Sequence, residues 1–260
     1  MVVRSRKRAR EAEAAASSSR ADLDVDTLAQ EETILLKSGY PQPERMVRYF
    51  ADGTFTDATL LLGGRSFRVH RVVLAAVSDY LNARLAGDWA DRTGPLEVLT
   101  DIPGDVASAV LDAVYKGECT ITAALLPAVL QAAHYLQILP LLNAAALSVE
   151  KRLLPANCMG AWRTAERYGL QMLEAAALKV ALANFRVVLT TDEFLMMPHN
   201  FVLALLSSDR LDEPEEERVF DTAVRWLAAQ QRPTTDEIGA LFSACRCLHY
   251  SSPRAACVLT

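Results

Sequence analysis

The chain has 260 residues, of which 51% are hydrophobic and 23% are charged, and its formal net charge at pH 7 is −5. Because this length exceeds that of a usual single domain, we expect two globular domains that each bury a substantial core. A net negative charge gives the chain as a whole no electrostatic reason to bind nucleic acid or an anionic membrane directly, so neither is expected as a partner.

Residues 1–26 differ in composition from the rest, because the basic run RSRKRAR is followed by EAEAAASSSR, which lacks large apolar residues. Such a segment buries too little surface to fold, so we expect a disordered tail. A basic run of this kind is typical both of nuclear-import signals and of solvated termini. The chain shows no signal peptide and no long apolar run, so we expect it in the cytoplasm, the nucleus or both.

The first structured segment begins with PERMVRYFADG, which predicts a short helix. Met46, Val47 and Phe50 share one face of it, and an Asp-Gly pair ends it. The next stretch, DATLLLGGRSFRVH, has two apolar runs that flank the glycines at 63–64. Because glycine accepts the positive φ angles of tight turns, this stretch predicts a β-hairpin.

Helical spacing returns at Arg71, and LEVLT, after the polar GDWADRTG, predicts another strand. The stretch GDVASAVLDAVYKG predicts a helix that ends before Gly117 and buries Val106, Val110, Ala113 and Val114. A further helix is expected over 125–139, with an apolar stripe of Leu125, Val129, Ala132, Leu136 and Leu139. Few strands among many helices indicate an α+β domain.

After Pro140 the sequence predicts helices alone. Pro140 and Pro155 suit helix starts, Asn157 suits an N-cap and Gly169 suits a helix end. Two further apolar stripes are expected, one made by Leu173, Ala176, Val180, Ala183 and Val187 and the other by Phe220, Val224 and Leu227. The second domain is therefore expected to be an all-helical stack.

Several of these segments resemble a known family. DATLLLGGRSFRVHRVVLAAVSDYL, DIPGDVASAVLDAVYKGECTI and LQAAHYLQI are similar to the signature of the BTB (POZ) domain. LPANCMGAWRTAERYGLQML and LLSSDRLDEPEEERVFDTAVRWL resemble the BACK domain that follows BTB in Kelch-like proteins. The resemblance implies an α+β BTB/POZ domain with an N-terminal extension over 27–139 and an all-α BACK domain over 140–260, incomplete at its C-terminal end.

The resemblance implies a homodimer formed through the BTB domain. The residues that it places at or near the dimer interface are Met46, Phe50, Asp57, His70 and Arg71. Burying the charges of Asp57 and Arg71 is costly unless each meets a partner, so this pair would set specificity more than affinity. The alternative is that Asp57 only caps a turn and that Arg71 is solvated.

The resemblance also implies binding to cullin-3. In the family, the loop after the third helix carries a bulky apolar residue followed two positions later by an acid, and GDWADR offers Trp89 and Asp91 there. Leu85 and Tyr115 match further apolar positions of the same surface. Trp89 could instead fold back onto its own domain. One departure is that Arg84-Leu85 stands where the family commonly has a pair such as Met-Phe.

A second cullin contact is implied for residues 157–170, which receive the N-terminal extension of the cullin in family members; the alternative is plain core packing. The function implied is that of an adaptor that recruits an unknown protein substrate to a cullin-3 RING ubiquitin ligase. No Kelch repeats follow in this sequence. The chain is therefore expected to be a truncated adaptor or a fragment, or to select partners through some other surface; a short form could also compete with full-length adaptors. The rival hypothesis is an oligomerising scaffold or transcriptional regulator that acts without cullin.

An enzyme is not expected, and neither a cofactor nor a metal is predicted. Cys158 with His134 or His70 could pair a nucleophile with a base, but each lies in an apolar pattern. CRCLHY offers Cys245, Cys247 and His249, which are three ligands without a fourth. The five cysteines are irregularly spaced, so no disulfide framework is expected, and Cys119 and Cys158 are interpreted as small core residues.

Overall fold

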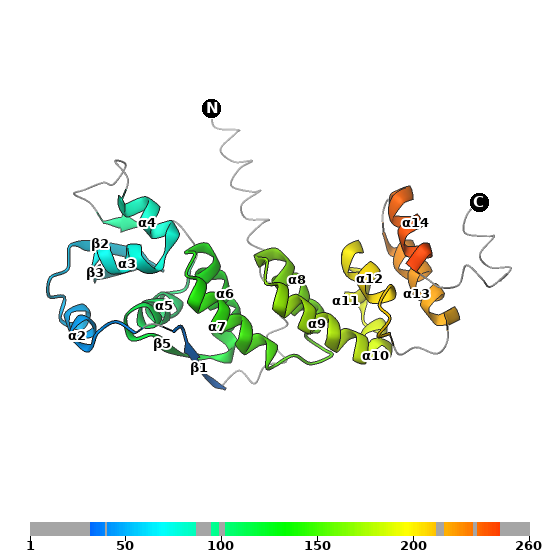
Figure 1. Ribbon diagram of the computed structural model, residues 1–260, viewed down its shortest axis with the longest axis horizontal. Helices are drawn as coiled ribbons and strands as arrows, with labels where there is room; N and C mark the ends of the chain where they lie inside the picture. Colours follow the sequence, from blue (N-terminus) through cyan, green and yellow to red (C-terminus); the bar gives the residue numbers. More distant parts are fainter. Residues whose placement is uncertain are drawn as a thin grey trace, which may run out of the picture. The chain divides into compact units, whose positions relative to one another are not determined.

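The computed structural model describes residues 32–39, 41–86, 95–98, 102–211, 216–230 and 233–244. These divide between Arg152 and Leu153 into two compact units (Figure 1). The first unit mixes strands and helices, and its described elements are β1 (Thr33–Lys37), α2 (Glu44–Asp52), β2 (Ala58–Leu62), β3 (Arg65–Val69), α3 (Arg71–Val77), α4 (Asp79–Ala86), β4 (Leu96–Glu97), α5 (Gly104–Lys116), β5 (Glu118–Thr122), a short 3-10 turn (Ala123–Leu125), α6 (Leu126–Tyr135) and α7 (Leu139–Glu150).

The predicted hairpin is confirmed. β2 and β3 pair antiparallel with Leu60 opposite Phe67, and β4 adds a parallel strand with Leu96 opposite Leu60. Gly63 and Gly64 have φ angles of 60° and 70°, which favour glycine. A Cβ atom at Gly63 would lie 2.7 Å from the carbonyl oxygen of Ile102, so the turn also packs too closely for a side chain.

Helix α5 forms the centre of the first unit. It packs against β5, α6, α3 and α2, and its predicted core residues are confirmed: Val106, Val110, Ala113 and Val114 are at most 3% exposed. The helix ends at Gly117, whose φ of 76° gives the left-handed cap that the sequence indicated. α2 and α3, which carry predicted dimer residues, are therefore both held on this buried helix.

One sheet was not predicted. β1 pairs antiparallel with β5, with Ile34 opposite Ile121 and Leu36 opposite Cys119. All four of these side chains are buried, whereas the intervening Leu35 is 52% exposed. The strands lie far apart in the sequence, so neither shows a local turn signal that would identify its partner.

The helix predicted over 125–139 is confirmed up to Tyr135 and is wrong after it. α6 ends at Tyr135, Gln137 adopts a left-handed conformation with φ 53°, and α7 begins at Leu139. Leu139 consequently leaves the predicted apolar stripe and is 58% exposed. Because α7 packs on α6 and β1, the first unit continues to Arg152, beyond the domain boundary placed at 139/140 from the sequence.

The second unit is helical throughout its described residues, as predicted. Its helices are α8 (Cys158–Tyr168), α9 (Gln171–Ala183), α10 (Phe185–Leu189), α11 (Asp192–Leu195), α12 (His199–Leu206), α13 (Glu216–Ala229) and α14 (Thr235–Ala244). Gly169 ends α8 with a φ of 66°, as expected. Asn157 precedes α8, but its side-chain oxygen accepts the backbone N–H of Leu154 at 2.7 Å and does not cap the helix.

The apolar stripe predicted along α9 is wrong. Leu173 is buried as expected, but the other buried positions are Ala177, Ala181 and Leu182. Val187, the last predicted member, is 54% exposed. α9 packs most extensively against α8, whose buried residues include Gly160, Ala161 and Ala165. Because small residues let the two helices approach closely, α9 turns its alanines, and not its valines, toward α8.

The core of the second unit uses its two described tryptophans. Trp162 of α8 and Phe201 of α12 meet edge to face, with ring centroids 5.0 Å apart. The indole N–H of Trp226 on α13 donates to the buried carbonyl oxygen of Met197 at 2.9 Å. On the predicted stripe of α13, Leu227 is buried, while Phe220 and Val224 are half-buried. In the part of the chain that the structure describes, no helix is long and apolar enough to cross a membrane.

Candidate functional site

The predicted dimer residues Met46 and Phe50 lie on α2, and both are half-buried. None of the nine residues of α2 is buried. The Phe50 ring stacks on Tyr115 of α5, with centroids 4.0 Å apart and planes 7° apart. α2 therefore contacts α5 on one side and leaves part of its apolar face accessible, as expected of a helix that packs on a partner.

Two exposed apolar side chains that were not singled out from the sequence flank this region. Phe55, just after α2, is 75% exposed, and Val72, at the start of α3, is 69% exposed. Phe55 also has a φ of 57° and meets Tyr49 of α2 edge to face at 4.9 Å. A bulky residue seldom holds a positive φ, so the backbone positions this ring outward at an energetic cost.

Asp57 and Arg71 meet in the structure through the backbone. The Asp57 carboxylate accepts the backbone N–H of Arg71 at 2.7 Å, which satisfies a free donor in the first turn of α3. The Arg71 guanidinium donates to the carbonyl oxygen of Leu85 at 2.8 Å, near the C-terminal end of α4, where a positive charge is favoured. Within one protomer, Asp57 therefore acts as the cap that the alternative interpretation expected. Arg71, a predicted dimer residue, bonds to the backbone of Leu85, a predicted cullin residue.

His70 is the buried centre of this junction, with 4% of its surface exposed. Its Nε2 lies 3.0 Å from the carbonyl oxygen of Thr54, which can only accept, so Nε2 donates. The Tyr115 hydroxyl accepts the backbone N–H of His70 and lies 3.0 Å from its Nδ1, to which it can donate. These bonds join the turn after α2, the start of α3 and the end of α5. Burial raises the pKa of Tyr115, so its hydroxyl keeps the proton that this arrangement uses.

The predicted cullin residues fall into two groups. Leu85 and Tyr115 are 8% and 0% exposed, so their side chains are not accessible to a partner in this structure. Trp89 and Asp91 lie outside the described residues. The segments that flank them are described, and β4 holds one flank in place by pairing with β2 and by the bond from Val98 N–H to the Leu61 carbonyl oxygen at 3.0 Å.

A group of three side chains on α4 and α6 was missed from the sequence, and we call it the tyrosine–arginine cluster: Tyr80, Arg84 and Tyr135. The two tyrosine rings lie 5.1 Å apart, and their hydroxyls are 3.4 Å apart. Arg84 Nη1 donates to the Tyr80 hydroxyl at 3.2 Å and to the Glu97 carbonyl oxygen at 2.8 Å. Arg84 thereby links α4 to β4. The spacing of Tyr80 and Arg84, one helical turn apart, was the available signal.

The other predicted cullin contact, residues 157–170, corresponds to α8 and its flanks. Seven of its eleven helical residues are buried, so most of this helix forms core, which is the plain-packing alternative. Glu166 and Arg167 are exposed and remain accessible to a partner. Any contact here would therefore involve the last turns of α8.

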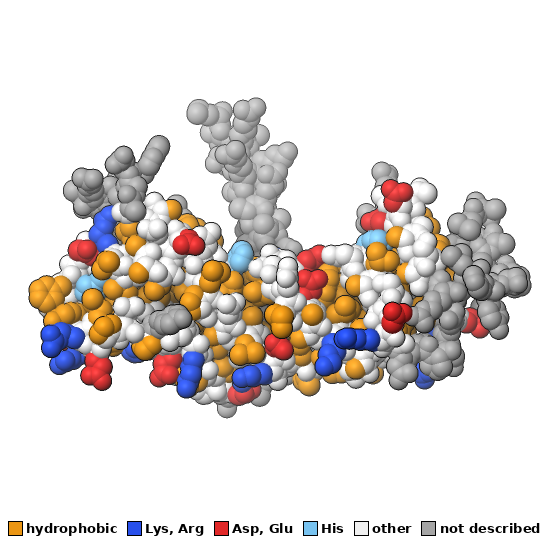
Figure 2. All heavy atoms as spheres, in the orientation of Figure 1, with side chains coloured by type: hydrophobic (Ala, Val, Ile, Leu, Met, Phe, Trp, Pro, Cys, Tyr) orange, Lys and Arg blue, Asp and Glu red, His pale blue; other side chains and the backbone are white. Residues whose placement is uncertain are grey.

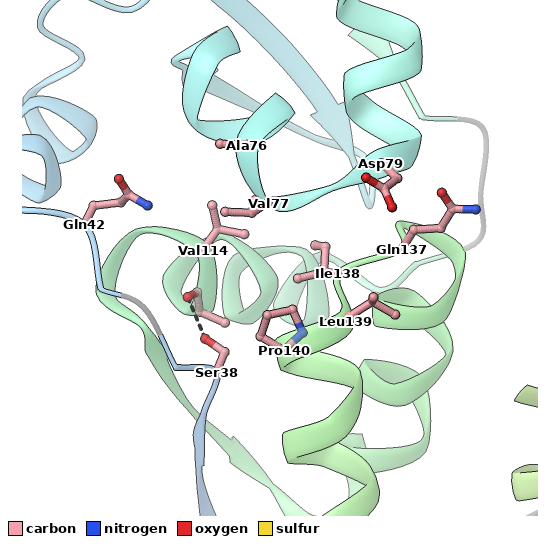
Figure 3. Close-up of a pocket in the computed structure, with 11 residues that line it drawn as sticks. Ser38, Gln42, Ala76, Val77, Asp79, Val114, Gln137, Ile138, Leu139 and Pro140 are labelled. Carbon is pink, nitrogen blue, oxygen red and sulfur yellow. Dashed lines mark hydrogen bonds between the residues drawn. The ribbon is translucent and has the colours of Figure 1, made fainter. Parts of the chain in front are cut away.

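A cavity of about 430 Å³ opens in the first unit (Figure 3). Val77, Val114 and Ile138 are among its apolar lining, and Asp79 and Gln137 supply polar groups at one side. Its volume lies in the range of small-ligand sites. The lining comes from α3, the start of α4, α5, the α6–α7 turn, the start of α7 and the segment before α2, so no single motif in the sequence indicates it.

Only some of the candidate catalytic and metal-ligating residues lie within the described part of the chain. Burial raises the pKa of the Cys119 thiol and of the Cys158 thiol to about 11, so both stay protonated and are poor nucleophiles. No group of three potential metal ligands occurs among the described residues, and Cys245, Cys247 and His249 lie outside them. On the face drawn in Figure 2, acidic and basic side chains are interspersed among apolar ones.

Comparison with known families gives two matches. Residues 46–153 match the BTB/POZ domain, and residues 158–253 match the domain described as BTB And C-terminal Kelch (BACK). A solved structure described as the BTB domain of zebrafish PATZ1 is 25% identical and covers 41% of this chain and 86% of that one, with a TM-score of 0.37.

Three curated relatives are similar over about two thirds to three quarters of this chain. Kelch-like protein 6 of Homo sapiens is 31% identical over 68% of this chain, and Kelch-like protein 25 of Xenopus tropicalis is 32% identical over 66%. Kelch-like protein 40 of Mus musculus is 31% identical over 75%. The matched regions span 28%, 30% and 32% of the lengths of these relatives.

Proposed function

Because the chain belongs to the BTB–BACK family, whose Kelch-like members it resembles, we propose that it is a protein-interaction adaptor that forms a homodimer and binds cullin-3. The observation that carries this proposal is the order of the two domains, BTB and then BACK. Recruitment of a protein substrate to a RING ubiquitin ligase is part of the same proposal.

The dimer part of the proposal is supported by α2. A nine-residue helix with an amphipathic face and no buried residue is weakly held by its own protomer. A second copy packing on Met46, and on the exposed Phe55 and Val72, would remove this apolar surface from water. The two-fold symmetry of most homodimers would place the same residues on both sides of the interface.

Sedimentation equilibrium of the full chain tests the dimer. The unaltered chain is expected to be dimeric at micromolar concentration, and Met46→Glu is expected to shift it to monomer, because a carboxylate would be buried without a partner. Arg45→Glu is the matched control, since it places the same side chain on the exposed neighbouring position. A monomeric unaltered chain, or equal effects of the two substitutions, would contradict this interface.

The cullin part is supported by the sequence between α4 and β4, which carries Trp89 and Asp91, and by the contacts of Arg84 and β4 that hold the described flanks in place. An aromatic ring can fill a pocket on a partner, and an adjacent acid can orient the contact. Leu85 and Tyr115 would act by holding α4 and α5 in place beneath it. Arg71 would support both surfaces through its bond to the Leu85 carbonyl oxygen.

Calorimetric titration of the purified chain with the N-terminal domain of cullin-3 tests this contact. Binding at micromolar affinity or tighter is expected, and Trp89→Ala and Asp91→Lys are expected to weaken it roughly tenfold or more while the protein stays dimeric. If a well-folded dimer does not bind, the cullin role is wrong, and an oligomerising scaffold that acts without cullin becomes the better account.

A further inference from the structure

Hydrogen bonds hold both sides of the cavity in the first unit. On one side, the Ser78 hydroxyl donates to the Leu136 carbonyl oxygen and accepts the backbone N–H of Leu81 at 3.0 Å, which joins the start of α4 to the α6–α7 turn. On the other side, the backbone N–H of Gln42 donates to the Tyr115 carbonyl oxygen at 3.0 Å, which joins the segment before α2 to α5. The cavity is therefore formed in advance, and a pre-formed site loses less entropy when a ligand binds.

The middle of the cavity is aliphatic. Val77, Val114 and Ile138 line it there (Figure 3), and the exposed Leu139 extends this apolar surface at the rim. None of the described residues that line the cavity is basic or aromatic. An aliphatic side chain placed here by a ligand would remove apolar surface from water, at about 25 cal/mol per Å².

The polar side chains at the rim are available to a ligand. Asp79 and Gln137 lie toward one side of the cavity and Gln42 toward the other (Figure 3). The carboxylate and the two side-chain amides make no hydrogen bond or ion pair within the described part of the chain. The fourth polar side chain of the lining, Ser38, is already used, because its hydroxyl donates to the Ala113 carbonyl oxygen at 2.8 Å.

The backbone at the rim is strained. Gln137 has a φ of 53°, a conformation that costs energy for a residue with a side chain. The N–H of Gln137 donates to the His134 carbonyl oxygen at 3.1 Å, and the N–H of Ile138 donates to that of Ala133 at 2.9 Å, so the surrounding turn imposes this conformation. Residues held in this way cluster at ligand sites, so the strain favours a binding site over a simple gap in packing.

We propose that this cavity binds an extended peptide segment of a partner protein, with an aliphatic side chain in the cavity and a lysine or arginine next to it. A glutamine amide can both donate and accept, as pairing with a peptide backbone requires, and Gln42 and Gln137 offer such amides on opposite sides. Among the described residues that line the cavity, only Asp79 is charged, so it selects a basic neighbour and disfavours an acidic one. The inference goes beyond the proposed function and does not depend on cullin-3.

A small apolar molecule fits this site less well than a peptide. Such a molecule would cover the carboxylate and the amides without offering them partners, and a polar group that loses water without a new partner costs about 1–3 kcal/mol. Ala76 and Leu139 of the lining are exposed, so the cavity opens to solvent and a chain can enter and leave it.

The test selects random peptides of about twelve residues, displayed on phage, against the full chain and titrates the enriched peptides by calorimetry. Enriched sequences are expected to carry Leu, Ile or Val within two positions of Lys or Arg. Asp79→Asn is expected to weaken their binding roughly tenfold, because it removes a charge-assisted contact. Asp192→Asn is the matched control, since it removes an exposed acid from the first turn of α11 in the second unit, and it should leave binding unchanged.

A blocking variant locates the bound peptide. Ala76→Trp places a large ring at an exposed position of the lining and should abolish binding while circular dichroism shows an unchanged fold. The inference is wrong if no sequence is enriched, if the peptides bind Ala76→Trp as tightly as the unaltered chain, or if Asp79→Asn binds within twofold of it. If Ala76→Trp converts a dimeric chain to monomer, a second copy occupies the cavity and the inference is also wrong. Each of these results leaves the proposed function standing, because the titration with cullin-3 tests that separately.

Discussion

Removing the Tyr115 hydroxyl is expected to destabilise the first unit strongly. Tyr115→Phe leaves the backbone N–H and Nδ1 of His70 buried without the oxygen that both contact at 3.0 Å. Each buried polar group that loses its partner costs about 1–3 kcal/mol. Part of this is offset because the hydroxyl itself no longer has to be desolvated, so we expect a net loss of about 2–4 kcal/mol.

Thermal and urea unfolding followed by circular dichroism measure this loss. For a domain of this size, about 1 kcal/mol corresponds to roughly 3–5 °C, so Tm is expected to fall by roughly 6–20 °C. Tyr135→Phe is the matched control, because it makes the same chemical change where the side chain is 38% exposed and its hydroxyl lies 3.4 Å from that of Tyr80. That variant should change stability by less than about 0.5 kcal/mol.

Comparing the two variants shows whether the buried Tyr115 hydroxyl stabilises the protein more than an exposed tyrosine hydroxyl does. Equal losses for Tyr115→Phe and Tyr135→Phe would show that the buried hydroxyl contributes no more than a surface one. A loss below about 0.5 kcal/mol for Tyr115→Phe would show the same, since an unmet buried donor costs more than that. Either result would refute the view that His70 and Tyr115 hold the candidate dimer surface together.

Three further outcomes follow from individual contacts. Asp57→Ala removes the acceptor for the first N–H of α3 and should cost about 0.5–2 kcal/mol in urea unfolding, whereas Asp57→Asn should retain most of the stability. Trp226→Phe leaves a buried carbonyl oxygen of the second unit without its donor and should cost about 1–3 kcal/mol by the same assay. Burial raises the pKa of the Cys119 and Cys158 thiols to about 11. The stability that the two neutral, buried thiols contribute is therefore complete below about pH 9 and is lost as the pH rises to about 11. Both thiols should resist alkylation at pH 8 until the protein unfolds, as measured by mass spectrometry, and rapid labelling of the native protein would contradict their burial.

The sequence predicted those parts of the fold that depend on neighbours in the chain. The hairpin at Gly63 and the end of α5 at Gly117 follow from glycines that must adopt positive φ angles, and both are confirmed. The pairing of β1 with β5 was missed, because the burial of Ile34 and Ile121 depends on a strand that is distant in the sequence. The break at Gln137 was missed for another reason: the left-handed residue is not glycine, so composition does not mark it.

For the candidate sites too, the sequence identified individual residues but not the contacts between them. The family resemblance indicated His70 and Tyr115, but their mutual hydrogen bonds and their burial depend on how α3 meets α5. The roles of Asp57 as a cap and of Arg71 as a donor to Leu85 likewise appear only once the turn is built. Tyr135 comes from a helix distant in the sequence from Tyr80, so the tyrosine–arginine cluster could not be assembled from spacing alone.

The pairing of β1 with β5 also bears on how the first unit folds. Lys37 lies opposite Glu118, so this ladder closes a loop that contains α2, the hairpin and α5. Closing so long a loop costs conformational entropy before the contacts between β1 and β5 can offset that cost. This sheet is therefore expected to form late in folding. During synthesis β1 leaves the ribosome well before its partner strand, and until β5 arrives its apolar residues must be kept from pairing with other chains. The last sheet to form thus decides how long the nascent protein needs protection.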